Sequence, residues 1–329
     1  MDFSKQKMGE IMRVLKGFIL SICFAASMQL TGCGDNNSSN TPIVSQYAIT
    51  EHATPATGRM ANDITSGPDG NLWFTEEAGY IGKISTAGVI TEYAVTTGGR
   101  PVFIAAGSDG NLWFTDMASP YIGKITITGS ITVYSTGSIP SCITSGPDGN
   151  LWFTEMAGKI GKITTAGVVT EFDVPTINGY PFGIASGPDG NLWFTEQAGK
   201  IGKITTAGVI TEYDVPSVGS FPFAITSGTD GNLWFTEIIG NKIGKITTAG
   251  VITEYAIPTM GSRPGGIASG LNGNLWFTET TGNKIGKITT GGAITEYTVP
   301  TSASNPGGIT FGPDGNIWFT ESNKIGVVK

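Results

Sequence analysis

The stretch Gly67-Pro68-Asp69-Gly70-Asn71-Leu72-Trp73-Phe74-Thr75-Glu76 decides the fold, because it returns six more times along the chain with small changes. The seven copies contain all seven tryptophans of the protein, at positions 73, 113, 152, 193, 234, 276 and 318. Their spacing stays near 41 residues throughout. A period of about 40 residues that holds over many copies is typical of a repeat architecture.

The fourth copy shows what one repeat contains. Residues 183–186 suit a short strand, and Pro188-Asp189-Gly190 suits a tight turn, because proline fixes φ and glycine accepts a positive φ. Residues 191–196, 200–205 and 209–215 are rich in β-branched and aromatic side chains and predict three more strands. Four strands in one repeat predict a propeller blade. The fold class is therefore all-β: a seven-bladed β-propeller of four-stranded blades.

The two ends of the repeat region predict how the ring closes. The seventh copy stops at Lys329 without a fourth strand, while residues 44–49 resemble a fourth strand that has no blade of its own. We infer that this N-terminal strand completes the last blade and locks the ring. His52, the only histidine, follows it and is expected in a solvated loop.

The first 32 residues predict a lipoprotein signal peptide. Four cationic residues within positions 5–16 precede the apolar run 18–26. The run ends at Leu30-Thr31-Gly32-Cys33, which resembles a lipobox and implies cleavage before Cys33 and lipidation of its thiol. The alternative is an ordinary signal peptide with a chance cysteine. Residues 33–43 are predicted to be a flexible tether and 44–329 the propeller. This organisation predicts a bacterial envelope protein, bound to the membrane through a lipid anchor at the outer membrane or cell surface.

Charge and cysteine content narrow the function classes. The chain has 26 acidic and 19 basic residues, a net charge of −7, and no basic run, so nucleic acid is a poor candidate partner. Of three cysteines only Cys142 lies in the predicted propeller, so no disulfide is expected there. One histidine without a cysteine cluster gives no zinc site. We expect a monomer.

The repeats differ most in the segment that enters the first strand of each blade. In up-and-down blades this segment and the loop after the second strand lie on one face of the ring. The predicted ligand-binding face comprises Arg100, Tyr180, Phe182, Phe221, Phe223, Arg263 and Asn305. A mouth with an apolar sector and a few polar groups suits a small molecule, a saccharide, a peptide or a protein.

A carboxylate ends each predicted second strand on the same face. These residues are Glu76, Asp116, Glu155, Glu196, Glu237, Glu279 and Glu321. One interpretation is an ion pair with the repeated lysine of the third strand, at 83, 124, 162, 203, 245 and 287. The other is a hard cation, with Glu279 and Glu321 as candidate metal ligands. The second repeat departs from the pattern at Ser108, Asp116 and Val133, and the sequence offers no functional explanation.

The repeated Leu-Trp-Phe-Thr-Glu and Lys-Ile-Gly-Lys-Ile-Thr blocks over residues 44–329 resemble the streptogramin B lyase (virginiamycin B lyase) family. The resemblance implies a seven-bladed propeller that opens a cyclic depsipeptide antibiotic at its ester by Mg²⁺-dependent elimination. A histidine base would remove a proton next to a carbonyl, and the metal would stabilise the developing enolate.

The family's two histidine positions are glycine in this chain. The last blade of the lyases opens with Glu-Pro-His-Gly and the preceding blade with Pro-His-Gly. Here the corresponding residues are Asn305-Pro306-Gly307-Gly308 and Pro264-Gly265-Gly266, and only Glu321 of the family's set is retained. No catalytic residue is therefore confirmed by the resemblance.

Two functions from different classes follow. The missing histidines favour a propeller that binds a ligand or partner. The alternative is a Mg²⁺-dependent carbon–oxygen lyase for streptogramin B antibiotics or a related substrate, with Glu321, Glu279 or Tyr180 as the base. A structural surface protein without a ligand is a third interpretation.

Overall fold

The computed structural model describes residues 47–56, 58–96 and 99–329. The chain divides into two units, 1–47 and 48–329, and the second is the propeller. The predicted signal peptide, the tether and Cys33 lie outside the described residues and remain predictions. No helix in the described part of the chain is long and apolar enough to cross a membrane.

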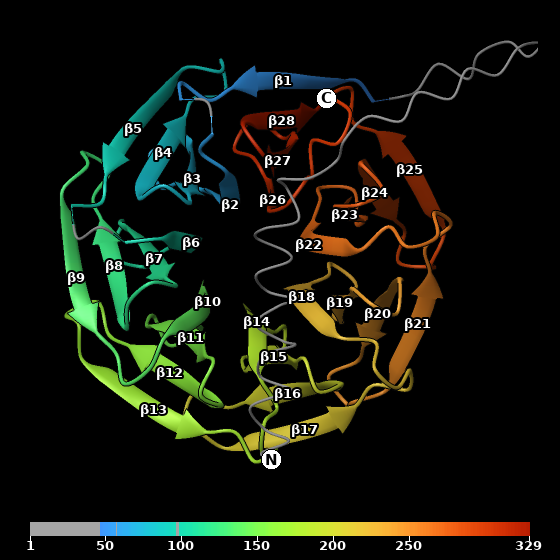
Figure 1. Cartoon of the computed structure of the whole chain (residues 1–329). Helices are drawn as coiled ribbons and strands as arrows, with labels where there is room; N and C mark the ends of the chain where they lie inside the picture. The colour runs from blue at the N-terminus through green and yellow to red at the C-terminus, as the bar shows by residue number, and fades with distance from the viewer. Residues whose placement is uncertain (1–46, 57, 97–98) are drawn as a thin grey trace, which may run out of the picture. The chain divides into compact units, whose positions relative to one another are not determined.

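Seven antiparallel four-stranded sheets stand around a ring, as predicted (Figure 1). We number these sheets as blades 1 to 7 in chain order. The inner strands are β2 (Ala61–Ser66), β6 (Pro101–Ala106), β10 (Pro140–Ser145), β14 (Pro181–Ser186), β18 (Pro222–Ser227), β22 (Pro264–Ser269) and β26 (Ile309–Phe311). The second strands are β3 (Leu72–Glu76), β7 (Leu112–Asp116), β11 (Leu151–Glu155), β15 (Leu192–Glu196), β19 (Leu233–Glu237), β23 (Leu275–Glu279) and β27 (Ile317–Glu321).

The remaining strands complete each blade toward its outer edge. The third strands are β4 (Tyr80–Ile84), β8 (Tyr121–Ile125), β12 (Lys159–Ile163), β16 (Lys200–Ile204), β20 (Lys242–Ile246), β24 (Lys284–Ile288) and β28 (Lys324–Val328). The outer strands are β5 (Ile90–Ala94), β9 (Ile131–Ser135), β13 (Val169–Asp173), β17 (Ile210–Asp214), β21 (Ile252–Ala256), β25 (Ile294–Thr298) and β1 (Ile49–Ala53).

Blade 7 is closed by the N-terminal strand, which confirms the predicted closure. Its sheet has the order β1-β28-β27-β26, with Ile49 opposite Val328 and Ala53 opposite Lys324. The described closing strand is Ile49–Ala53, whereas we predicted residues 44–49, of which 44–46 lie outside the described residues; the predicted bounds were therefore placed too early. The sequence Ile-Thr-Glu-His-Ala matches the Ile-Thr-Glu-Tyr-Ala of β5, and this match brings Glu51 to the place of the other outer glutamates.

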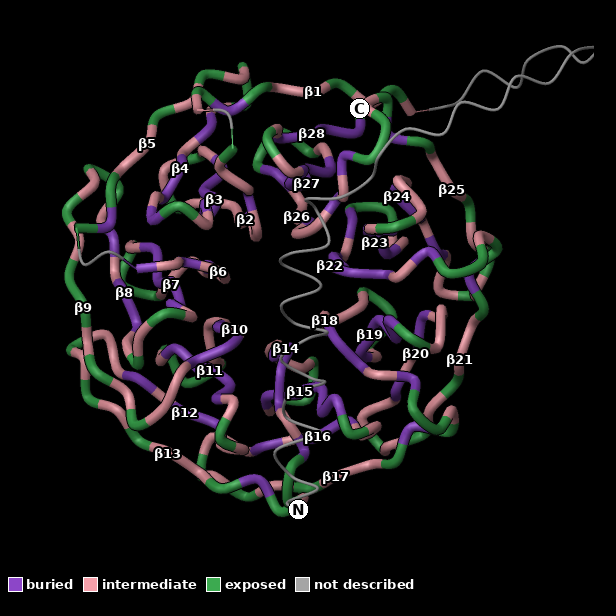
Figure 2. The backbone as a smooth tube through the Cα atoms, in the orientation of Figure 1, coloured by how far each residue is buried: buried purple, intermediate pink, exposed green. Residues whose placement is uncertain are grey.

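The hydrophobic core lies between neighbouring blades. Trp73 of blade 1, for example, packs in one cluster with Leu112 and Phe114 of blade 2. The second strands are buried at every residue, whereas residues of the outer strands alternate between half-buried and exposed (Figure 2). Glycine recurs in the third strand because the ring of Phe74 occupies the space that a Cβ on Gly82 would need. Stability therefore comes from contacts that each blade makes with the next.

The alternating strand directions define two faces of the ring. The mouth face is the one where inner and third strands begin and second and outer strands end. It carries the crossovers, which we define as the segments that link an outer strand to the inner strand of the next blade. The base face carries the turns between inner and second strands and those between third and outer strands.

Candidate functional site

The carboxylate at the end of each second strand lies at the mouth face but is covered. Glu196 pairs in register with Pro181 of the inner strand and Lys200 of the third strand, and its side chain is fully buried. In six blades neither carboxylate oxygen has a hydrogen-bond partner of normal geometry among the described residues. These residues are Glu76, Glu155, Glu196, Glu237, Glu279 and Glu321.

Burial and a second glutamate raise the pKa values of these six groups. Burial raises the pKa of Glu196 to about 8, and the nearby charge of Glu212 on the outer strand adds to the shift. The same two causes raise the pKa values of the other five to about 7. Burial favours the neutral form of a carboxyl group, so these residues exchange between neutral and ionised forms near neutral pH.

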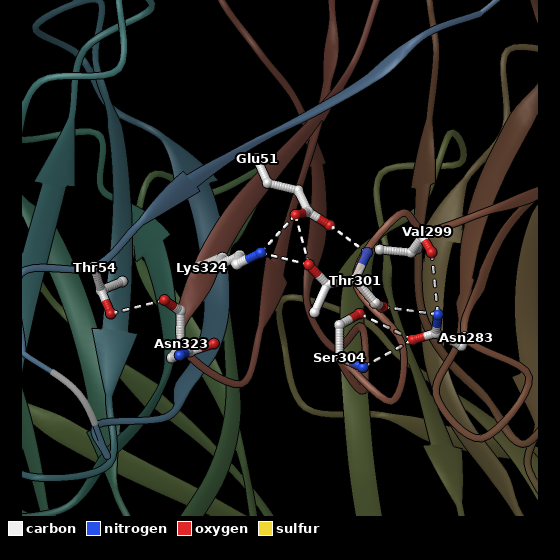
Figure 3. Close-up of polar contacts among 8 residues, drawn as sticks. All are labelled: Glu51, Thr54, Asn283, Val299, Thr301, Ser304, Asn323 and Lys324. Atoms are coloured by element: carbon white, nitrogen blue, oxygen red, sulfur yellow. Dashed lines mark hydrogen bonds and ion pairs between the residues drawn. The ribbon is translucent and has the colours of Figure 1, made fainter. Parts of the chain in front are cut away.

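The outer glutamates have the opposite environment. Glu51 accepts hydrogen bonds from Lys324 at 2.6 Å and from the amide and hydroxyl of Thr301 at 2.9 and 2.7 Å (Figure 3). Burial raises the pKa of Glu51, but these donors outweigh it and leave the pKa below its ordinary value. Glu254 and Glu296 are held in the same way by Lys242 with Ser217 and by Lys284 with Thr259. In every blade except blade 2, the outer glutamate thus ties a crossover to its blade.

The predicted pairing of the second-strand glutamates with the repeated lysines is wrong. Lys83 lies opposite Trp73 in the register, three residues from Glu76, because the hairpin places Tyr80 opposite that glutamate. The ammonium of Lys83 lies instead 5.2 Å from the Trp73 ring and 3.7 Å from Asp69, at the base face. The repeated lysines are therefore part of the base face and leave the mouth carboxylates unpaired with them.

Blade 2 differs from the other blades because hydrogen-bond donors contact its buried carboxylate. This difference accounts for two of its unusual residues, Asp116 and Val133. Asp116 replaces the glutamate and accepts a hydrogen bond from the Tyr121 hydroxyl at 2.9 Å and from the Ala118 amide at 2.8 Å. Val133 stands on the outer strand where other blades carry glutamate, so no second carboxylate faces Asp116. Asp116 and Val133 are thus linked through the buried carboxylate, whereas Ser108 lies at the base face, where its hydroxyl donates to the Gly149 carbonyl.

Four of the predicted mouth residues have a strained backbone. Each of the four immediately precedes a proline at the entrance to an inner strand. Their φ values are 51° for Tyr180, 60° for Phe221, 53° for Arg263 and 52° for Asn305. For residues with a side chain this left-handed conformation costs about 1 kcal/mol or more, and a following proline disfavours helical backbone further. All four lie half-buried at the entrances to blades 4 to 7.

The other predicted mouth residues fall into two groups. Arg100 forms an ion pair with Glu77 and does not have the left-handed conformation. Phe182 and Phe223 are only 5% and 9% exposed, and their rings stack with centroids 4.3 Å apart. Phe103 of blade 2 meets Phe182 edge-on at 5.4 Å. These three rings, the aromatic cluster, fill the space between inner strands.

Sequence comparison of one repeat position missed Phe103 and Asp63, which lie one residue further along their inner strands. Asp63 accepts a hydrogen bond from the Ile104 amide at 3.1 Å, and burial raises its pKa to about 7. The sequence did distinguish these residues. The repeat position that Asp63 and Phe103 occupy is glycine or alanine in blades 4 to 7 but varies in blades 1 to 3.

The family resemblance places its two histidines at Gly265 and Gly307, where a Cβ would lie 2.9 Å from the Thr278 hydroxyl oxygen and 3.0 Å from the Thr320 hydroxyl oxygen. The glycines that follow them, Gly266 and Gly308, lie against the next blade. The Gly266 amide donates to the Gly307 carbonyl at 3.3 Å, and the Gly308 amide donates to the Asn62 carbonyl at 3.0 Å. Neighbouring inner strands therefore approach closely here, and a Cβ on Gly308 would lie 2.7 Å from the Asp63 Cα.

His52 is part of a strand and not of a loop, so that prediction was wrong. It lies in β1, and its ring stacks on Trp318 at 5.8 Å in the position that Tyr93 holds on Trp73 in blade 1. Burial, followed by the charge of Lys329, lowers the pKa of His52. The only histidine of the chain therefore serves the packing of the ring closure.

The residues at hand do not form a magnesium site. Glu279 and Glu321 end the second strands of different blades, and each lies buried beside the outer glutamate of its own blade, which a lysine already binds. Within the described residues no group of three or more acidic, histidine or cysteine side chains is placed to hold a metal ion. Magnesium thus stays a prediction from the family resemblance.

Comparison with known proteins agrees with this architecture. The sequence pattern of the Virginiamycin B lyase family matches residues 36–158 and 133–329. A streptogramin B lyase structure is 41% identical, with a TM-score of 0.83, over 86% of this chain and 97% of that one. The virginiamycin B lyase of Staphylococcus aureus is 42% identical, with a TM-score of 0.83, over 86% of this chain and 99% of that one.

A second structure of the Staphylococcus aureus enzyme contains quinupristin and a histidine-to-alanine substitution that makes it catalytically inactive. The WD40 propeller domain of Doa1 is only 12% identical, with a TM-score of 0.72, and shares the fold alone. No sequence among the curated proteins matches the chain.

Proposed function

The chain belongs to the Virginiamycin B lyase family, and from this premise we propose that it is a binding propeller that has lost the lyase reaction. Its ligand would occupy the mouth face at the entrances to blades 4 to 7. The ligand would be a small molecule, saccharide, peptide or protein segment with an apolar or aromatic part.

The place of the only histidine carries this proposal. In the Staphylococcus aureus enzyme, replacing one histidine with alanine abolishes catalysis. The single histidine here, His52, is held against Trp318 in an outer strand and lies away from the mouth. The inner-strand glycines 265 and 307 have no group that could remove a proton. The family's acid–base chemistry therefore has no residue to perform it.

The strained residues support a binding role at the same mouth. Glycine would adopt the left-handed conformation without cost, yet the chain carries Tyr180, Phe221, Arg263 and Asn305 there. Strained backbone with functional side chains concentrates at ligand sites. Phe182 and Phe223 of the aromatic cluster follow Tyr180 and Phe221 by two residues and are almost fully buried and stacked.

One observation favours a second candidate, an elimination with another base. A pKa near 7, as Glu279 and Glu321 have, suits a general base at neutral pH. Both carboxyl groups are covered by crossovers, however, so a substrate would reach them only after those segments moved. Tyr180, which is half-buried, is the remaining candidate base.

The proposal includes attachment to the bacterial envelope through lipid on Cys33, at the outer membrane or cell surface. It rests on the apolar run 18–26 and the lipobox-like residues 30–33. Labelling with a radioactive fatty acid in cells tests it, with Cys33→Ser as the control that should lose the label.

The test of function uses the purified protein with quinupristin and Mg²⁺. Elimination would change the chromatographic retention of the antibiotic without changing its mass. We expect no ring opening above a blank, and calorimetric binding of quinupristin that Phe221→Gly weakens by about tenfold or more. Val209→Ser, a change on the base face, should bind normally. Ring opening that EDTA abolishes would overturn the binding-only proposal, and Glu321→Gln would then identify or exclude that base.

A further inference from the structure

Three neighbouring crossovers each present one aliphatic side chain to solvent. Ile177, Val218 and Met260 occupy the third position of the segments 175–180, 216–221 and 258–263, and their exposed fractions are 88%, 101% and 93%. Ile239, in the loop between β19 and β20, is 58% exposed in the same sector. We call these four residues the apolar arc.

The apolar arc is confined to blades 4 to 6. The crossover into blade 7 carries Ser302 at the corresponding position, and Met60 and Ile139, in the crossovers into blades 1 and 3, are half-buried. Single exposed aliphatic residues are common on proteins, and the base-face turns also carry exposed valines at matching positions, so the charges beside the arc provide the second observation. Since the frame of each blade repeats with or without them, these side chains are not required by the fold.

The crossovers hold these tips rigidly. In the segment around Met260, the Thr259 amide donates to Glu296 at 2.9 Å and the Ser262 amide donates to Asn241 Oδ1 at 2.8 Å. Met260 therefore lies between Thr259 and Ser262, whose amides are both hydrogen-bonded. A surface that is already ordered loses little conformational entropy when a partner binds.

The charges beside the arc point to a cationic partner. Asp173 and Asp214 lie four residues before Ile177 and Val218, and their side chains are 89% and 85% exposed. Around these two aspartates, carboxylates outnumber lysines. Lys159 forms ion pairs with both Glu171 and Asp173. Lys200 pairs with Asp214, whereas Glu212 accepts hydrogen bonds from Thr176. With a net charge of −7 as well, the chain repels anionic lipid and its own copies.

We propose that the apolar arc is a docking surface for a protein segment that presents aliphatic side chains flanked by lysine or arginine. The aliphatic side chains of that segment would cover Ile177, Val218 and Met260, and its cations would meet Asp173 and Asp214. Ile177, Val218 and Met260 each lie three residues before the strained residue of the same crossover, so the two surfaces use different side chains.

A synthetic twelve-residue peptide of alternating leucine and lysine is the probe, with fluorescence anisotropy of the labelled peptide as the readout. We expect the combined Ile177→Ser, Val218→Ser and Met260→Ser variant to bind it about tenfold more weakly or worse. The matched control is Val168→Ser, Val209→Ser and Val251→Ser, three valines of the base face that are each 63% exposed. Binding of the control should equal that of the parent protein.

Equal loss in both triple variants, or no loss in the first, would overturn the proposal. So would failure of the parent to bind the peptide at all. Sedimentation velocity tests a second copy as the occupant, and flotation with phosphatidylethanolamine–phosphatidylglycerol vesicles tests lipid. Self-association or flotation that only the first triple variant loses would assign the arc to those occupants instead. Thermal melting of each variant confirms that folding is unchanged.

Discussion

The base face and the mouth face place the repeated charged residues of each blade in opposite environments. At the base face the Trp73 indole donates to Asp69 at 3.0 Å, and Lys83 lies over the indole while approaching the same carboxylate. This arrangement recurs in blades 2 to 5, whereas blade 6 has Asn272 in place of the aspartate and blade 7 has Val327 in place of the lysine. At the mouth face the repeated glutamate is buried without a donor, the crossovers differ, and four residues are strained. The base face keeps the ring together, and the mouth face carries the buried carboxyl groups and the strained residues.

The largest expected effect comes from removing the strand that serves both faces. A chain that begins at Pro55 lacks β1, which bonds Thr301 and Lys324 at the mouth and covers Trp318 at the base. Its loss exposes the edge of β28 and the buried core of blade 7. We expect no cooperative thermal transition by tryptophan fluorescence, whereas a chain that begins at Ala48 should melt like the parent. An unchanged melting temperature in the shorter chain would contradict closure by β1.

The buried glutamates should make stability fall as the pH rises. A folded pKa of about 8 for Glu196 exceeds the value of 4.5 expected when the chain is unfolded. The stabilisation is therefore complete below about pH 4.5 and is lost as the pH rises through 8. Glu196→Gln removes this titration, so we expect it to be about 4 kcal/mol more stable than the parent at pH 9 and nearly equal at pH 4.

Comparing the two proteins in urea at each pH isolates this effect from other titrating groups. His52, with its lowered pKa, contributes stability that is present above pH 6.5 and is lost as the pH falls, and it is common to both proteins. Parallel pH profiles for Glu196→Gln and the parent would show that water or a bound cation already compensates the buried charge.

Blade 2 offers a sharper test of the same face. Tyr121→Phe removes the hydroxyl that bonds Asp116 and leaves a buried oxygen without its donor, which we expect to cost about 1 to 2 kcal/mol. Tyr80→Phe is the matched control, because Tyr80 holds the same position in blade 1 and its ring lies 3.6 Å from the Arg59 guanidinium. Equal costs in urea denaturation would mean that the tyrosine ring, and not its hydroxyl, stabilises both blades.

The contrast between the faces also explains what the sequence could predict. The spacing of the tryptophans indicates seven blades, because each tryptophan fills the same interface. The partner of the repeated lysine could not be found by similarity alone, because the hairpin register decides whether Lys83 meets Trp73 or Glu76. The left-handed backbone of Tyr180, Phe221 and Arg263 is likewise invisible, since none of these residue types favours it. Tertiary contacts of the crossovers impose it.

The smallest change in stability should come from relieving backbone strain at a residue outside the proposed binding site. Ala303 lies in the crossover into blade 7 with φ of 53° and an exposed methyl group. Ala303→Gly should therefore stabilise the protein by about 0.5 to 1 kcal/mol, measured as a shift in the urea midpoint. If Phe221→Gly gives a similar gain in stability while quinupristin binding falls, the strain at Phe221 is retained for its side chain. If the Phe221→Gly variant instead shows lower stability and weaker binding, the Phe221 side chain serves packing. The mouth face would then differ from the base face only in its shape.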